Sequence, residues 1–320
     1  MFMNIPKLAD EIICGRRLTR DDNVSSLLTA DLTELTQGAD RIREQLHGDC
    51  AELCSIINGR SGKCSEDCKF CAQSACHGTD VDVYAFLPED EILKECLYNE
   101  RKGVKRFSVV TAGRTLGDAD FRRALSAYRL MKRESSIGLC ASHGLLTEEQ
   151  FGRLFEAGVT RYHCNIETSR RYFPSICSTH TFEDKLDCIK RAQKHGLEVC
   201  SGGIIGMGET WEDRLDMALT LSELGVVSVP INILNPIQGT PMGNMPPLSK
   251  EDILRTVAVF RYIVPDADIR LAGGRGLLGD KGRSAFRSGA NAAITGDMLT
   301  TSGISVGTDK IMLSELNYKL

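Results

Sequence analysis

The sequence predicts a (β/α)8 barrel, the TIM-barrel fold, with an N-terminal helical extension and a short C-terminal tail. Helix-start signals recur at intervals of 29 to 39 residues, short apolar runs lie between them, and glycines separate several helices from the run that follows. One strand and one helix need about 30 residues, and parallel strands covered on both faces are apolar almost throughout. A doubly wound open sheet is the alternative that this pattern also allows.

Six positions carry the signals of a helix N-terminus. Proline fits the first helical turn and acidic residues interact favourably with the helix dipole, as at Pro88 and the three acidic residues after it. A Ser or Thr with an acid or amide three residues later can form a capping box. The expected helices start near Pro88, Asp118, Thr147, Thr181, Thr210 and Ser249.

Seven apolar runs, and an eighth near the C-terminus, are expected to be the strands. The predicted strands are 53–58, 106–112, 137–142, 160–167, 197–205, 226–234, 268–272 and 290–295. In a barrel of this kind the active site lies at the carboxyl ends of the strands. Polar or reactive side chains within these runs are therefore the candidates for function.

Residues 1–50 are expected to form the helical extension, 51–298 the barrel and 299–320 the tail, with no linker between them. The chain has 320 residues and a formal net charge of −4, so we expect no basic surface for nucleic acid. No apolar run is long enough to span a membrane, and Met1–Arg20 lacks the pattern of a secretory signal. We therefore expect a cytoplasmic protein that binds neither membranes nor nucleic acids.

The sequence has 13 cysteines, an odd number and too few for a disulfide scaffold of this length. In a reducing compartment, cysteines beyond those needed for packing more often bind metals or take part in chemistry. Three of them, Cys64, Cys68 and Cys71, form a C-x3-C-x2-C motif soon after the first predicted strand. Three thiolates can hold three irons of a 4Fe–4S cluster and leave the fourth iron open to a small chelating molecule. A zinc site completed by the nearby His77 is the alternative.

This motif, with the aromatic Phe70 before its third cysteine, resembles the cluster motif of the radical S-adenosyl-L-methionine (SAM) superfamily. The resemblance implies that SAM chelates the open iron through its amino and carboxylate groups, with Phe70 at the SAM site. It also implies that one-electron reduction cleaves SAM and releases a 5′-deoxyadenosyl radical. The cofactor then carries the reaction and the protein positions it.

Further motifs narrow the resemblance to the biotin synthase family and extend it from about residue 10 to 318. They lie at 58–74, 161–168, 200–209, 228–232 and 269–275. The resemblance implies a sulfurtransferase that converts dethiobiotin to biotin. Successive 5′-deoxyadenosyl radicals remove two hydrogens, and an auxiliary iron–sulfur cluster donates the sulfur.

The family resemblance also assigns residues to the bound molecules. Asn165 and Glu167 stand where the family positions the SAM ribose and the substrate. Glu167 replaces the usual aspartate with a carboxylate one methylene longer, which can still accept hydrogen bonds. Ile204 is expected against the adenine, and Asn232 is expected to bind the ureido ring of dethiobiotin. A simpler role for both asparagines is to cap a strand end.

The auxiliary cluster of the family is a 2Fe–2S cluster bound by three cysteines and one arginine. Cys140, Cys200 and Arg270 match three of these positions, whereas Ser108 stands at the fourth, and serine is a poor ligand for iron in a sulfide cluster. We expect Cys54 on the first strand to supply the missing thiolate. Because this ligand comes from a different strand, our hypothesis is a larger auxiliary cluster with four irons and an additional sulfide. The alternative for Arg270 is an ion pair inside the barrel.

The remaining thiols and histidines have weaker claims to a function. Strand alternation would point Cys164 away from the cavity that Asn165 and Glu167 face, unless a bulge intervenes. Cys177 lies in a loop that we expect near the barrel mouth. Packing or solvent contact is expected for the scattered histidines His143, His163, His180 and His195.

The family resemblance implies four partners: dethiobiotin, SAM, a reductant of the flavodoxin or ferredoxin type, and a second copy of the chain in a homodimer. Two other functions stay open. One is a related radical SAM enzyme of the hydrogenase-maturase or methylornithine-synthase type, which shares the motif and the barrel but would form no biotin. The other is a non-enzymatic iron–sulfur carrier, which would not need eight strand–helix units around a cavity.

Overall fold

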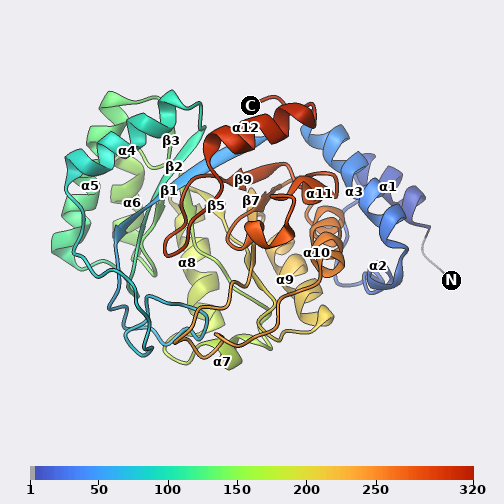
Figure 1. Ribbon diagram of the computed structural model, residues 1–320, viewed down its shortest axis with the longest axis horizontal. Helices are drawn as coiled ribbons and strands as arrows, with labels where there is room; N and C mark the ends of the chain where they lie inside the picture. The colour runs from blue at the N-terminus through green and yellow to red at the C-terminus, as the bar shows by residue number, and fades with distance from the viewer. Residues whose placement is uncertain (1–3) are drawn as a thin grey trace.

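The computed structural model describes residues 4–320 and shows a closed barrel of parallel strands surrounded by helices (Figure 1). The first three residues of the predicted extension lie outside the described residues. The predicted (β/α)8 barrel is confirmed, and the open-sheet alternative is wrong. The strands are β1 (Glu52–Arg60), β2 (Arg106–Thr111), β3 (Gly138–Ser142), β4 (Arg161–His163), β5 (Glu198–Cys200), β6 (Gly203–Ile205), β7 (Ser228–Ile233), β8 (Asp268–Leu271) and β9 (Ala292–Ile294).

Helices follow most strands and pack outside the barrel, as Figure 1 shows for α4 to α6 and for α8 to α10. The helices are α1 (Ile5–Ile13), α2 (Ser26–Thr29), α3 (Leu32–His47), α4 (Glu89–Arg101), α5 (Asp118–Glu134), α6 (Glu148–Glu156), α7 (Phe173–Ile176), α8 (Phe182–Lys194), α9 (Trp211–Glu223), α10 (Lys250–Ile263), the 3-10 helix η1 (Arg275–Leu278), α11 (Arg283–Phe286) and α12 (Val306–Glu315).

The predicted helix starts are confirmed to within one residue. Three threonines form capping boxes with the side chain three positions later, and Ser249 accepts a hydrogen bond from the backbone N–H of Asp252 at the start of α10. The three capping threonines are Thr147, Thr181 and Thr210. Each cap satisfies a backbone N–H that the helix itself leaves without a partner.

The strand order shows how the barrel closes. Strands β1 to β5 are neighbours in chain order, β9 lies between β1 and β8, and the ring closes where Cys200 of β5 pairs with Ser228 of β7. The predicted strand 197–205 is two strands, β5 and β6. They are interrupted at Gly202, where a Cβ atom would lie 2.0 Å from the carbonyl oxygen of Pro230.

The fourth strand is also shorter than predicted. It ends at His163, and the chain continues in an irregular conformation in which Glu167 has a φ of 68°. Strand alternation therefore does not extend to residues 164–167, and it decides nothing about where Cys164 points.

The N-terminal helices α1 to α3 lie beside α10 on one side of the barrel (Figure 1). Helix α3 approaches α10 closely at Gly38, where a Cβ atom would lie 1.9 Å from the hydroxyl oxygen of Tyr262. At the other end of the chain, Lys319 forms a parallel bridge with Cys50, just before β1. Within residues 4–320, no helix combines the length and the apolar character that crossing a membrane requires.

Candidate active site

One cavity of about 420 Å³ extends through the barrel interior to the loops at the carboxyl ends of the strands. Pockets of roughly 300–1,000 Å³ hold small-molecule ligands. Every residue that the sequence analysis assigned to a cofactor or to the substrate lines it. These residues are Cys54, Cys64, Cys68, Phe70, Cys71, Cys140, Asn165, Glu167, Cys200, Ile204, Asn232 and Arg270. The structure thus brings the whole set together, while the role of each residue stays a prediction.

The cysteine motif lies on the loop after β1, at the mouth of the cavity. The side-chain oxygen of Gln73 accepts hydrogen bonds from Ser61 Oγ at 3.2 Å and from the N–H of Gly62 at 3.1 Å. The N–H of Cys64 donates to the carbonyl oxygen of Gln73 at 2.9 Å. Gly62 has a φ of 74°, a conformation that glycine adopts without strain. The protein's own hydrogen bonds therefore shape this loop.

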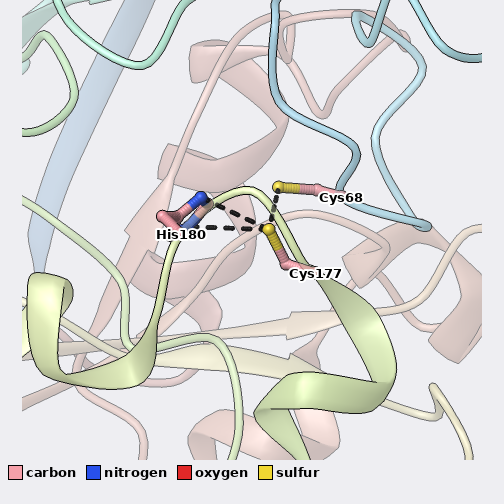
Figure 2. A group of neighbouring side chains, drawn as sticks. All are labelled: Cys68, Cys177 and His180. Carbon is pink, nitrogen blue, oxygen red and sulfur yellow. Dashed lines mark hydrogen bonds between the residues drawn. The ribbon is translucent and has the colours of Figure 1, made fainter.

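Cys68 has neighbours that the sequence analysis did not place beside it. Figure 2 shows its sulfur facing Cys177, in the turn after α7, with His180 alongside. The two Sγ atoms are 3.7 Å apart, and His180 Nδ1 lies 3.3 Å from Cys177 Sγ. The sequence analysis expected only packing or solvent contact for His180 and missed this contact. His77 contacts the carbonyl oxygen of Cys68 through Nε2 at 3.0 Å.

The two facing thiols affect each other's ionisation. The hydrogen bond from Cys68 lowers the pKa of Cys177 to about 4, and His180 contributes in the same direction. The same hydrogen bond and burial raise the pKa of Cys68. Of the two thiols, Cys177 is therefore the one that loses its proton more readily.

Three further thiols face the interior of the barrel. Cys54 on β1, Cys140 on β3 and Cys200 on β5 are all buried. Ser108 on β2 is paired in register with Cys140, and its buried Oγ has no hydrogen-bond partner among the described residues. Buried hydroxyls are almost always satisfied in native proteins. Three thiols and an unsatisfied hydroxyl on one cavity wall fit the donor set of an iron–sulfur group.

Arginines surround the same end of the cavity. Arg270 contacts the carboxylate of Glu52, and its other N–H groups donate to Ser228 Oγ at 3.1 Å and to two backbone carbonyls. Arg106 and Arg161 each lie 3.0 Å from Glu52 as well. Glu198 also contacts Arg106 and Arg161, and Asp268 lies 4.0 Å from Arg270, so the three cations are shared among three carboxylates. The ion-pair alternative for Arg270 is confirmed as a contact, and its role as a cluster ligand stays a prediction.

This electrostatic environment alters the pKa of the groups that it surrounds. Burial raises the pKa of Glu52, but the charges of Arg270, Arg161 and Arg106 outweigh it and lower that pKa to about 2. The hydrogen bond from Cys54 lowers the pKa of Cys140 to about 7. The shift at Cys140 favours its thiolate, the form that binds metals, whereas the same hydrogen bond raises the pKa of Cys54.

A histidine acts in the same direction on the third interior thiol. Burial raises the pKa of Cys200, but the hydrogen bond and charge of His163 and the charge of Arg270 outweigh it, so the net shift is downward. The sequence analysis expected only packing or solvent contact for His163 and missed this role.

The segment after β4 places a carboxylate and an amide at the cavity. Asn165 Nδ2 donates to Glu167 Oε2 at 3.3 Å, and Asn165 Oδ1 accepts from the N–H of Gly202 at 3.0 Å. Burial raises the pKa of the Glu167 carboxyl group. Its φ of 68° is uncommon for a residue other than glycine, and such backbone strain clusters at functional sites.

Asn232 lies on β7 and contacts β6 on one side and the turn after β8 on the other. Its Nδ2 donates to the carbonyl oxygen of Gly203 at 3.1 Å, and its Oδ1 accepts from the N–H of Gly273 at 3.0 Å. Asn165 and Asn232 therefore both bind backbone groups beside a strand end, as the capping role requires. Both also line the cavity. Ile204, next to Gly203, is partly buried and adds apolar surface to the wall.

Lys185 is a cavity residue that sequence reasoning missed. It lies in the first turns of α8 and lines the cavity. Burial lowers the pKa of its ammonium group, but the nearby Cys164, Glu167 and Cys68 outweigh burial and raise it. A signal existed in the sequence, because a lysine near a helix N-terminus is unfavourable for the helix dipole.

Known families and proteins resemble this chain over nearly its whole length. The sequence pattern of the radical SAM superfamily matches residues 60–221, and that of the biotin and thiamin synthesis associated domain matches residues 230–319. The chain is 60% identical over 314 residues to a biotin synthase from Clostridium beijerinckii, covering 98% of this chain and 99% of the relative. It is 58% identical over 318 residues to a biotin synthase from Alkaliphilus metalliredigens, covering 99% and 100% of the two chains.

Solved structures support the fold. A methylornithine synthase superposes with a TM-score of 0.85 at 19% identity, covering 98% of this chain and 96% of that one. A maturase of the FeFe-hydrogenase superposes with a TM-score of 0.82 at 18% identity, covering 98% and 74%. At this level of identity the likeness concerns the architecture and not the reaction.

Proposed function

The chain belongs to the biotin synthase family of the radical SAM superfamily, and from this premise we propose how its residues divide the reaction between them. The function is the conversion of dethiobiotin to biotin by radical SAM sulfur insertion. When bound, the two iron–sulfur clusters supply the electron that cleaves SAM and the sulfur that enters the substrate. Everything else must come from the side chains around the cavity.

We assign the two clusters to the two groups of cavity thiols. The loop cysteines would hold the SAM-binding 4Fe–4S cluster, and the interior cysteines, with Arg270, would hold the auxiliary cluster. The loop set is Cys64, Cys68 and Cys71, and the interior set is Cys54, Cys140 and Cys200. The observation that carries this proposal is that both sets face one continuous cavity, so a substrate between them can reach both SAM and the sulfur donor.

Polar side chains on the cavity wall would orient the two small molecules. Glu167 can accept hydrogen bonds from the SAM ribose, and the Lys185 ammonium can neutralise the SAM carboxylate. Asn232 offers an amide to the ureido ring, while Phe70 and Ile204 supply apolar surface. Most of the lining is apolar, and this limits the access of water to the radical.

We further propose that the auxiliary cluster contains four irons and an additional sulfide. Its support is the position of Cys54 on β1, a strand that carries no ligand in the family's usual arrangement, together with the unsatisfied Ser108 hydroxyl. Two four-iron clusters would give about eight irons per chain, whereas a 2Fe–2S auxiliary cluster would give about six.

Iron and acid-labile sulfide analysis of the anaerobically reconstituted protein tests both proposals. We expect about eight irons in the wild type and about four in Cys54→Ser, because only the loop cluster would remain. Cys96→Ser is the matched control, since Cys96 is a buried thiol on α4, outside the cavity lining. About six irons in the wild type would contradict the four-iron hypothesis, and an unchanged iron content in Cys54→Ser would contradict the ligand assignment.

An activity assay tests the reaction itself. Reduced protein with SAM and dethiobiotin should yield biotin together with 5′-deoxyadenosine. 5′-Deoxyadenosine without biotin would point to a related radical SAM reaction of the maturase or methylornithine-synthase type, whose solved structures share this fold.

We also infer the setting in which the chain works. All 13 cysteines are free thiols, which supports a reducing, cytoplasmic location. A flavodoxin- or ferredoxin-type reductant would supply the electrons, and the functional unit would be a homodimer. Sedimentation of the reconstituted protein tests the homodimer, and SAM cleavage with each purified reductant tests the electron donor.

A further inference from the structure

Cys177 and His180 have no part in the proposed reaction, yet they lie against a cluster ligand. Cys68, Cys177 and His180 each offer a ligand atom, and these atoms all lie within 4.8 Å of one another (Figure 2). Cys177 is 4% exposed and His180 is 7% exposed. The three come from two loops that are more than 100 residues apart in the sequence, so the proximity is a product of the fold.

The spacing of these atoms is that of ligands to a single ion. Tetrahedral zinc, with Zn–S bonds of about 2.3 Å and Zn–N bonds of about 2.0 Å, places its sulfurs about 3.8 Å apart and a sulfur and a nitrogen about 3.5 Å apart. The observed Sγ–Sγ distance is 3.7 Å, and the two ring nitrogens of His180 lie 3.3 and 3.9 Å from Cys177 Sγ. Ligands of different irons in a four-iron cluster lie farther apart than this.

Two carboxylates complete the surroundings of the three ligands. His180 Nδ1 lies 2.5 Å from Glu66 Oε2, and Cys177 Sγ lies nearer to Nδ1 (3.3 Å) than to Nε2 (3.9 Å), so coordination through Nε2 requires the imidazole ring to turn towards the two sulfurs. A carboxylate that holds the second nitrogen of a histidine is the usual outer partner of a zinc ligand. Asp67 Oδ1 lies 3.2 Å from Cys177 Sγ and is the nearest oxygen for a fourth ligand position.

We propose that Cys68, Cys177 and His180, with Asp67, bind one divalent metal ion, zinc, in the chain that has not yet received its cluster. Two thiolates, an imidazole and a carboxylate suit zinc and favour it over ferrous iron. The ion would tie the loop after β1 to the turn between α7 and α8 and shield both thiols. If Cys68 is a ligand of the SAM-binding cluster, as proposed above, the ion and the cluster exclude each other.

Cobalt and zinc binding to the cluster-free chain test this site under anaerobic, reducing conditions. The full chain carries Cys64→Ala and Cys71→Ala, so that the motif alone cannot supply three thiolates. Tetrahedral cobalt with thiolate ligands has intense visible bands. We expect these bands in the double variant, displacement of cobalt by zinc, and two sulfurs in the zinc X-ray absorption spectrum.

Further substitutions in that background identify the ligands. Cys177→Ala should weaken zinc binding by more than about 100-fold, and His180→Ala should also weaken it. Cys188→Ala is the matched control, a buried thiol that interacts with another cysteine, Cys164, and should bind as the parent does. Circular dichroism checks the fold of each variant. Equal zinc affinity in the folded parent and Cys177→Ala proteins, or a zinc site with three sulfurs, would overturn the proposal.

Discussion

At the scale of single residues, Arg270 has a structural role that does not depend on any cofactor. Its guanidinium connects Ser228 on β7, the backbone of Ala293 on β9, and both the carboxylate and the backbone of Glu52 on β1. In the cluster-free protein, Arg270→Lys should lower the free energy of unfolding by about 2 kcal/mol. The single ammonium group of lysine cannot make all the hydrogen bonds that the N–H groups of the guanidinium make. Urea unfolding monitored by circular dichroism measures this loss of stability.

Arg287→Lys is the control for this substitution, because Arg287 is exposed and the change should stay within about 0.5 kcal/mol. If Arg270 served only to bind iron, both variants would unfold like the wild type when the clusters are absent. That result would contradict a structural role for Arg270.

The position of a residue at the cavity was predictable where a short sequence motif or the resemblance to a known family indicated it. The loop cysteines lie within one short motif, and Cys54 could be placed at the cavity because it lies on a strand with a buried face. The contact of Cys68 with Cys177 and His180 was not predictable, because it depends on how a loop after β1 meets a loop after α7. Nothing local in the sequence encodes that meeting.

At the scale of elements, β6 depends on a glycine at its first position. A Cβ atom on Gly203 would lie 2.3 Å from the carbonyl oxygen of Glu167 and 2.4 Å from Met217 Sδ. Gly203→Ala should therefore push β6 away from the segment that carries Glu167. We expect a loss of about 1–3 kcal/mol in stability, the usual cost of overpacking, and weaker SAM binding to the reconstituted protein by calorimetry.

Gly276→Ala provides the comparison, because a Cβ atom there would meet nothing within 4 Å and the position is exposed. It should leave SAM affinity and stability unchanged. SAM affinity that stayed equal in Gly203→Ala and in wild-type protein would show that β6 does not position the SAM site.

Elements with strong local signals were predicted well, and the breaks between elements were not. Capping residues marked the helix starts because a cap is formed by residues three apart in sequence. The split of the fifth predicted strand at Gly202 results from the close approach of Pro230 on β7, which is a tertiary contact. A continuous apolar run does not reveal such an interruption.

At the scale of the whole molecule, the arginines around Glu52 make the free energy of unfolding depend on pH. The pKa of Glu52 is lowered from 4.5 to about 2 in the folded chain, so the unfolded chain binds more protons in this range. This contribution to stability is fully present above the ordinary pKa of glutamate and is lost as the pH falls towards 2. Urea unfolding of the cluster-free protein at several pH values should show this loss.

Glu52→Gln isolates the part due to this carboxylate. The variant should be less stable than the wild type at neutral pH, and its stability should vary less between pH 4.5 and 2. Glu198→Gln, a more exposed carboxylate that contacts two of the same arginines, should change the profile much less. Parallel pH profiles of Glu52→Gln and wild type would contradict the assignment.

The insertion of β9 between β1 and β8 has a consequence for biosynthesis. Because synthesis proceeds from the N-terminus, β1 emerges from the ribosome long before residues 292–294 exist to cover its free edge. An uncovered edge can pair with other chains, so the nascent chain is open to mispairing until translation is almost complete. The same delay leaves one side of the barrel open until the last strand pairs with β1 and β8.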